Sequence, residues 1–119
     1  MRYLCLVYCE PQVFEHMSRE QKIRLDRDSL AYDDVLRASG HMIHAQALRS
    51  VDNAVTLRVR DGKMSSTDGP FAETKEHLGG FILIEASDME EAKRVAAGIP
   101  MAKLGSIEVR PIYDIPTWE

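Results

Sequence analysis

Residues 80–113 read GFILIEASDMEEAKRVAAGIPMAKLGSIEVRPIY, and this stretch predicts a strand, a helix and a second strand. The apolar run 80–86 is typical of a strand in the centre of a sheet. Asp88, with Glu91 three residues later, forms a capping-box pattern that starts a helix. The helix carries one apolar stripe with helical spacing, made by Met89, Ala92, Ala96 and Ile99. Residues 106–113 then alternate as a strand does, so this half of the chain predicts a β-α-β unit.

The first part of the chain repeats this pattern. Residues 2–9 alternate with period two and are apolar on both faces, which predicts a strand covered on both sides. Ser18 and Gln21 form a second capping box, and the helix they start is expected to run to about residue 39. Residues 42–48 are predicted to form the next strand.

The helix over residues 18–39 has two apolar stripes. One contains Ile23, Leu30, Ala31, Val35 and Ala38, and the other contains Leu25, Tyr32 and Leu36. Two stripes fit contact with the sheet on one side and with a partner subunit on the other. A single broad apolar face is the alternative reading.

Between the two β-α-β units lies an expected hairpin. Residues 54–60 alternate, Asp61-Gly62 is a two-residue turn signal, and residues 63–67 return as a polar strand. Without this hairpin, the order is that of an α+β, ferredoxin-like βαβ-βαβ fold, in a single domain over residues 1–119. Two helices cover one face of such a sheet, so we expect a second copy to cover the other face in a homodimer. In the alternative, the hairpin folds over that face.

Composition narrows the classes of function. The formal net charge is −4 with no basic block, so no nucleic-acid partner and no anionic membrane partner are expected. No apolar stretch is long enough to span a membrane, and the start of the chain resembles a strand more than a signal peptide. Cys5 and Cys9 are too far apart on one strand for a disulfide, which fits a reducing cytoplasm. The histidines lack the spacing of a metal site, and no cofactor motif occurs, so neither a metal nor a cofactor is expected.

The densest polar cluster spans residues 67–77, TDGPFAETKEH, between the hairpin and the central strand. Asp68 is the candidate catalytic acid or base, a role that requires burial to favour its protonated form. The other candidate catalytic residues are Glu73, Lys75 and Glu76, and the candidate substrate contacts are Thr67, Gly69, Pro70, Phe71 and His77. In the alternative reading, Asp68 accepts backbone hydrogen bonds in a turn and the charged run is a solvated surface.

Three segments of the chain together resemble the signature of the YCII-related, DGPF-domain family. They are VRDGK at 59–63, TDGPFAETKE at 67–76 and LGGF at 78–81. The matching motif residues are Asp68, Gly69, Pro70, Phe71, Glu73, Lys75, Glu76 and Gly80. The resemblance implies a dimeric α/β-barrel assembly of ferredoxin-like subunits in a bacterial cytosol. It implies no particular reaction, and because some members are fused to sigma-factor-like regions, a regulatory role is open.

The chain departs from the family at one position. YciI-type relatives carry a histidine in the first helix, proposed to form a dyad with an aspartate, whereas residues 18–39 contain no histidine and place Ser29 near that position. Two hypotheses follow. The chain is a cofactor-free enzyme that acts on a small molecule at a cleft between sheet and hairpin, or it is a non-catalytic ligand-binding or regulatory dimer.

Overall fold

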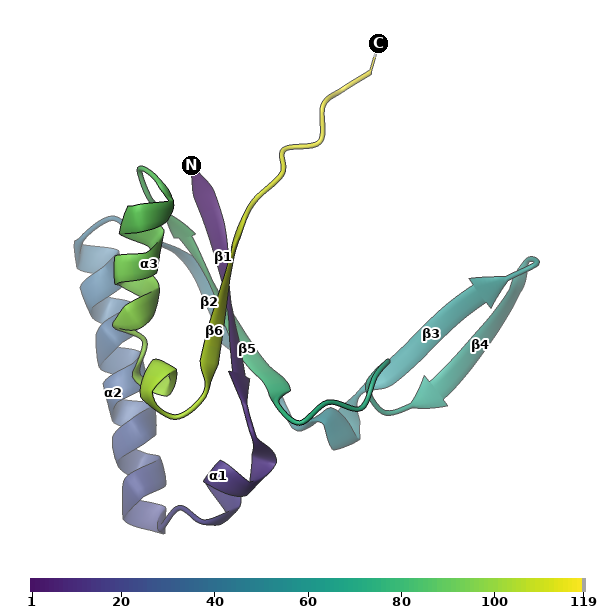
Figure 1. The fold of residues 1–119 in the computed structure, drawn as a ribbon, viewed down its shortest axis with the longest axis horizontal. Helices are drawn as coiled ribbons and strands as arrows, with labels where there is room; N and C mark the ends of the chain where they lie inside the picture. Colours follow the sequence, from purple (N-terminus) through teal and green to yellow (C-terminus); the bar gives the residue numbers. More distant parts are fainter. Residues whose placement is uncertain (119) are drawn as a thin grey trace.

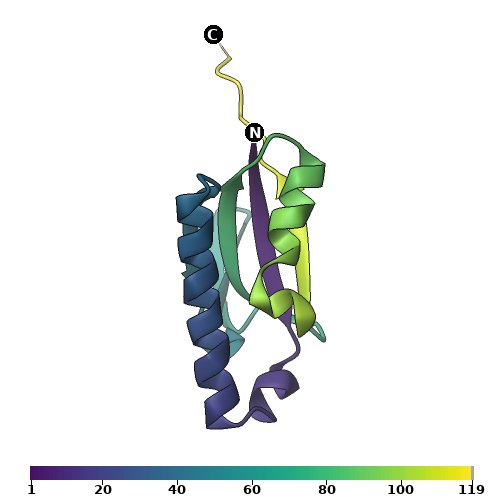
Figure 2. The same cartoon turned by 90° about the vertical axis from the view of Figure 1, so that its left-hand side faces the viewer.

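The computed structural model describes residues 1–118 and shows a two-layer α+β body with a projecting hairpin (Figure 1). The body contains two β-α-β units, β1(Arg2–Cys9), α2(Arg19–Ala38), β2(Met42–Ala47) and β5(His77–Glu85), α3(Met89–Ala97), β6(Ser106–Pro111). Their strands form a four-stranded sheet in the order β2-β5-β1-β6, and all neighbouring pairs are antiparallel. Both helices lie on one face of this sheet (Figure 2).

The predicted helix starts are confirmed. The Ser18 hydroxyl accepts a hydrogen bond from the backbone N–H of Gln21, and the Gln21 side chain accepts one from the backbone N–H of Ser18. The Asp88 carboxylate accepts a hydrogen bond from the backbone N–H of Glu91. The reciprocal contact of that second box is different, because Glu91 accepts from Ser87 instead of from Asp88.

Several predicted boundaries shift. β5 begins at His77, three residues before the apolar run, because antiparallel pairing with β1 continues to the pair Cys9–His77. β6 ends at Pro111. Three short helical segments were not predicted, namely α1(Pro11–Glu15), η1(Val51–Asn53) and η2(Pro100–Lys103), because one turn of helix is too short to show periodicity.

The core lies between the sheet and the two helices. Ile84 and Cys5 are fully buried on the two central strands, and Leu36 of α2 packs into the same core. Of the two stripes of α2, the one with Leu25, Tyr32 and Leu36 therefore faces the sheet. The other is exposed in a single chain, with Leu30 67% and Val35 56% exposed. Cys5 and Cys9 are free thiols in the core.

The hairpin is formed by β3(Val55–Arg60) and β4(Lys63–Asp68). Its turn has positive φ at both central residues, 53° at Asp61 and 72° at Gly62, as the sequence predicts. The hairpin stands away from the body, and we call residues 55–68 the arm (Figure 1). The alternative in which it folds over the open face of its own sheet is therefore wrong.

The centre of the sheet face opposite the helices is apolar, whereas the edge strands β2 and β6 are polar on this side. Leu4 and Leu6 of β1 and Phe81 and Leu83 of β5 are partly exposed there. Neither α2 nor α3 lies on this side of the sheet (Figures 1 and 2). We call this surface, made by these four side chains, the open face.

Candidate functional site

A pocket lies where the end of β1 meets the segment that leads into β5. It is a shallow depression of about 520 Å³, widely open to solvent, and is lined by Tyr8, Glu10, Thr74, Lys75 and Glu76. This volume falls in the range of about 300–1,000 Å³ that small-molecule sites occupy. The lining residues come from two segments far apart in sequence, so folding alone assembles the pocket.

Two backbone features shape the β1 side of the pocket. The pairing of β1 with β5 shifts between Val7 and Tyr8, where Val7 pairs with Gly80 and Tyr8 with Leu78, so Gly79 is an extra residue. Such bulges bend a strand and redirect its side chains. On the other side of β1, Gly105 lies against the Tyr8 carbonyl, where an added Cβ would be 2.0 Å from that oxygen.

Lys75 and Glu10 form an ion pair across the pocket. The Lys75 ammonium lies 3.3 Å from a Glu10 carboxylate oxygen, with the lysine 82% and the glutamate 24% exposed. The Gln12 amide also donates to Glu10 at 2.6 Å. The hydrogen bonds from Gln12 and Lys75 lower the pKa of Glu10, so this side chain is a carboxylate at neutral pH.

Glu76 is oriented by β6. The Ser106 hydroxyl lies 3.1 and 3.0 Å from the two carboxylate oxygens of Glu76. The backbone carbonyl of Glu76 accepts a hydrogen bond from the Thr74 hydroxyl at 2.5 Å. Side chain and backbone of Glu76 are therefore both held, and its carboxylate is a fixed hydrogen-bond acceptor beside the Lys75 cation.

Tyr8 supplies a phenol group. Its hydroxyl donates to a Glu108 carboxylate oxygen at 3.3 Å. Desolvation and the charge and hydrogen bond of Glu108 raise the pKa of Tyr8, so the phenol stays protonated. The pocket thus combines an ammonium as donor with carboxylates and a phenol oxygen as acceptors. Such a set fits a small molecule that carries both hydroxyl and carbonyl groups.

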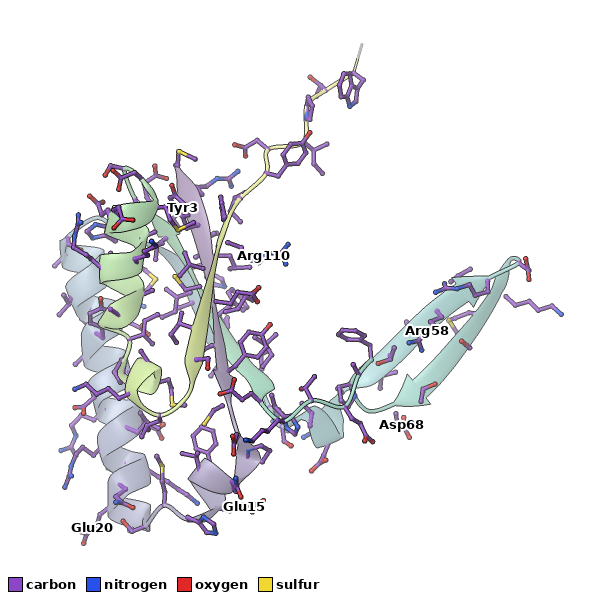
Figure 3. The ribbon with its side chains drawn as sticks, viewed as in Figure 1. Tyr3, Glu15, Glu20, Arg58, Asp68 and Arg110 are labelled. Atoms are coloured by element: carbon purple, nitrogen blue, oxygen red, sulfur yellow. The ribbon has the colours of Figure 1, made fainter. Side chains whose placement is uncertain are left out.

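The structure brings together only part of the predicted site. Lys75 and Glu76 line the pocket, and His77 follows them, half-buried at the start of β5. Thr67 and Asp68 belong to β4 and are exposed on the arm, outside the pocket lining (Figure 3). Between arm and pocket, the chain exposes Pro70, Phe71 and Glu73, with Phe71 80% exposed.

The turn after Asp68 has a structural role in a single chain. Gly69 has a φ of 106°, which side-chain-bearing residues rarely adopt. Its N–H donates to the Ala54 carbonyl at 2.7 Å, and its carbonyl accepts from the Thr56 hydroxyl at 2.9 Å. These bonds close the base of the arm.

Sequence reasoning missed part of the site. Tyr8 and Glu10 line the pocket, and Ser106 and Glu108 orient its side chains. The available signal was the polar end of an otherwise apolar strand at Tyr8 and Glu10. Ser106 and Glu108 gave none, because only the β1–β6 register places Ser106 opposite Tyr8.

A metal site is not apparent in the described part of the chain, where no group of three His, Cys, Asp or Glu side chains could hold an ion. In residues 1–118, no helix is both long enough and apolar enough to cross a bilayer.

The sequence matches the family model of the YCII-related domain over residues 1–116. The chain belongs to the YCII-related family. This YCII-related protein is 37% identical over 114 residues to an uncharacterised protein of Rhizobium meliloti (strain 1021), a match that covers 94% of this chain and 92% of that protein.

A solved structure has a similar fold. It is the 5-chloro-2-hydroxyhydroquinone dehydrochlorinase of Burkholderia phenoliruptrix, in complex with 2,5-dihydroxybenzoquinone. The superposition gives a TM-score of 0.56 at 19% identity and covers 95% of this chain and 94% of that one. At this identity, the likeness concerns the fold.

Proposed function

We propose that this YCII-related protein is a cofactor-free enzyme that acts on a small polar molecule in the pocket between Glu10 and Glu76. The observation that carries this proposal is the ion pair of Lys75 with Glu10 at the rim of a pocket of about 520 Å³. A lysine that is 82% exposed, yet tethered to a carboxylate, can bind an anionic or carbonyl oxygen of a ligand.

Each pocket residue has its own role in such an enzyme. Lys75 attracts and orients a negatively polarised oxygen. The Tyr8 phenol oxygen, whose proton is donated to Glu108, accepts a hydrogen bond beside it. Glu76 accepts a hydrogen bond from a hydroxyl group of the ligand, and its position is fixed by Ser106. Glu10 holds Lys75 in place, which is a positioning role.

Asp68 is the proposed acid or base in this reaction. In one chain it lies on the arm, at the end closer to the body (Figure 3). Asp68 does not line the pocket of its own chain. It can take part in catalysis only if a second molecule packs against the arm, so the proposed chemistry depends on dimer formation. The fold neighbour indicates which class of substrate to test, since it is a 5-chloro-2-hydroxyhydroquinone dehydrochlorinase whose structure contains 2,5-dihydroxybenzoquinone.

We further propose that two copies pair through the open face in a ferredoxin-like, dimeric α/β-barrel assembly. The strand order β2-β5-β1-β6 with both helices on one side supports the fold. The apolar open face supports the pairing, because a lone subunit leaves this surface in water. The free thiols of Cys5 and Cys9 support a cytoplasmic location.

The test uses 2,5-dihydroxybenzoquinone as a probe and amide NMR shifts as the readout. We expect shifts at Tyr8 and Thr74–Glu76, and an affinity at least tenfold weaker in Lys75→Met. Lys93→Met is the matched control, because Lys93 is an exposed lysine paired with Glu90 on α3. Equal affinity of both variants, or shifts confined to other residues, would overturn the pocket assignment.

Turnover separates the enzyme from a binding protein. Chloride release from 5-chloro-2-hydroxyhydroquinone, corrected for the rate without protein, is measured with the wild type and with Asp68→Asn. We expect a protein-dependent rate that Asp68→Asn lowers at least tenfold. Binding without turnover of this compound or its hydroxylated analogues would refute the enzyme in favour of the alternative.

The alternative is a non-catalytic ligand-binding or regulatory dimer. The hydrogen bonds of Gly69 with Ala54 and Thr56 favour it, since they give the turn after Asp68 a purely structural purpose. In that case, Asp68→Asn leaves ligand affinity and dimer formation unchanged.

A further inference from the structure

The arm has one apolar face without a partner. In the β3–β4 register, Leu57 pairs with Ser66 and Val59 pairs with Met64, so these side chains share one face with Val55. Val55, Leu57, Val59 and Met64 are 57%, 60%, 62% and 67% exposed. The opposite face is basic and polar, with Arg58, Arg60 and Lys63. This alternation is that of a strand pair with one buried face.

A hairpin of this kind does not stand alone in water. An isolated two-stranded hairpin is at best marginally stable and needs a packing surface. The arm gains none from its own body, as every residue of β4 is exposed. Its apolar face therefore requires another molecule to cover it.

The position of the arm indicates which molecule that is. The arm leaves the body on the side of the open face, at one end of the sheet (Figure 1). The C-terminal segment leaves on the same side at the other end, and exposes Tyr113, Ile115 and Trp118 at 74%, 81% and 86%. A body seated on the open face lies between these two apolar projections.

A second copy of this chain can cover all of these apolar surfaces at once. It carries the same open face, arm and C-terminal segment, so a two-fold pair covers each apolar surface twice. Six residues on the apolar face of the arm, seven in the segment 112–118 and four on the open face approach the roughly 20–30 residues per side of a standard interface.

We infer that the arm docks through its Val55–Leu57–Val59 face on a second copy of this chain and thereby places Asp68 at the contact between the two copies. Asp68 is the cross-strand partner of Val55 and lies on the apolar face of the arm. Docking covers this carboxyl group, which is exposed in a single chain. The role of Asp68 as acid or base rests on the proposed function, whereas the docking does not.

The first test compares two adjacent serines on β4. Ser66 faces the apolar side of the arm, opposite Leu57, and Ser65 faces the polar side, opposite Arg58. Ser66→Lys and Ser65→Lys introduce the same charge at exposed positions without removing an apolar side chain. We expect Ser66→Lys to weaken self-association at least tenfold, and Ser65→Lys to change it less than threefold, by sedimentation equilibrium.

The second test measures where Asp68 lies and needs no loss of assembly. Asp68→Cys and Thr67→Cys place a thiol on opposite faces of the arm, while the native Cys5 and Cys9 are buried. At concentrations where the protein self-associates, we expect position 68 to react with a thiol reagent at least tenfold more slowly than position 67.

The outcomes separate the two proposals. Self-association that both lysine variants leave intact, with equal labelling at 67 and 68, overturns arm docking and leaves the open-face dimer and the pocket untouched. A wild type that remains monomeric at high micromolar concentration overturns the docking and the dimer together. Absence of turnover, together with the expected slower labelling at position 68 than at position 67, would refute the proposed enzyme and leave the arm docking in place.

Discussion

Of the glycines, Gly105 leaves the least space for a Cβ atom, and it lies next to the pocket. A Cβ built there would lie 2.0 Å from the Tyr8 carbonyl oxygen and 3.1 Å from the Cys9 Cα. Both are backbone atoms, and β1 is held on its two sides by β5 and β6. Gly105→Ala therefore cannot be accommodated by rotation of a side chain, and the end of β1 must move.

The size of this effect follows from the contact distance. Overpacking in a well-packed region costs about 1–3 kcal/mol, and a clash with fixed backbone belongs at the upper end, so we expect a loss of at least about 2 kcal/mol. Gly79 is the matched control, since its Cβ would lie 3.8 Å from the Val7 carbonyl oxygen, an ordinary contact. Gly79→Ala is expected to change stability by less than about 1 kcal/mol, in the stabilising direction.

Urea unfolding at one fixed protein concentration measures both variants. With a slope of about 1.5 kcal/mol/M, Gly105→Ala moves the midpoint down by more than about 1 M, and Gly79→Ala moves it by less than about 0.7 M. Because the Tyr8 backbone moves, Gly105→Ala also weakens probe binding in the pocket. Equal midpoints for the two variants would refute the argument that Gly105 is fixed by backbone contact.

Three further predictions concern the core and the titrating groups. Leu36→Ala, at a residue 2% exposed, loses about 2–5 kcal/mol of unfolding free energy in denaturant titrations, whereas Leu30→Ala, at 67% exposure, changes it little. The hydrogen bond from Ser87 lowers the pKa of Glu91, so its stabilisation is present above the unfolded-state pKa and is lost as pH falls through the folded-state value. Glu91→Gln should reduce the fall in melting temperature as the pH is lowered. The same fall in the variant and the wild type would contradict this role of Glu91. Burial raises the pKa of Cys5 to about 11, so a thiol reagent at pH 8 should modify it only after unfolding; fast labelling of the native protein would contradict this burial.

The sequence predicted most of the elements because their signals are local. Ser18 with Gln21 and Asp61 with Gly62 each fix a helix start or a turn within four residues, and the structure confirms both. The path of the arm was not predictable in this way. Whether a hairpin folds back or stands away depends on the turn at Gly69, and the sequence showed only that a turn occurs there.

Only part of the candidate site was predicted, because only local signals are visible in a sequence. Lys75 and Glu76 stood out as adjacent charges, whereas their partners Glu10 and Ser106 are distant in sequence. Charge identity is visible in a sequence, but the register that brings β1 and β6 to residues 74–76 is a property of the sheet. The role of Asp68 stays a prediction, because a single chain leaves it on the surface of the arm.

The arm and the pocket are mechanically connected through residues 69–76. This segment is held at one end by the Gly69 N–H bonded to Ala54 and at the other by Lys75 paired with Glu10. The proposed docking of the arm on a second copy would therefore restrict this segment from its arm end, and a ligand in the pocket would restrict it from the other. Binding in the pocket and association of two copies should consequently favour each other, since both restrict the same eight residues and the second event has less freedom left to restrict.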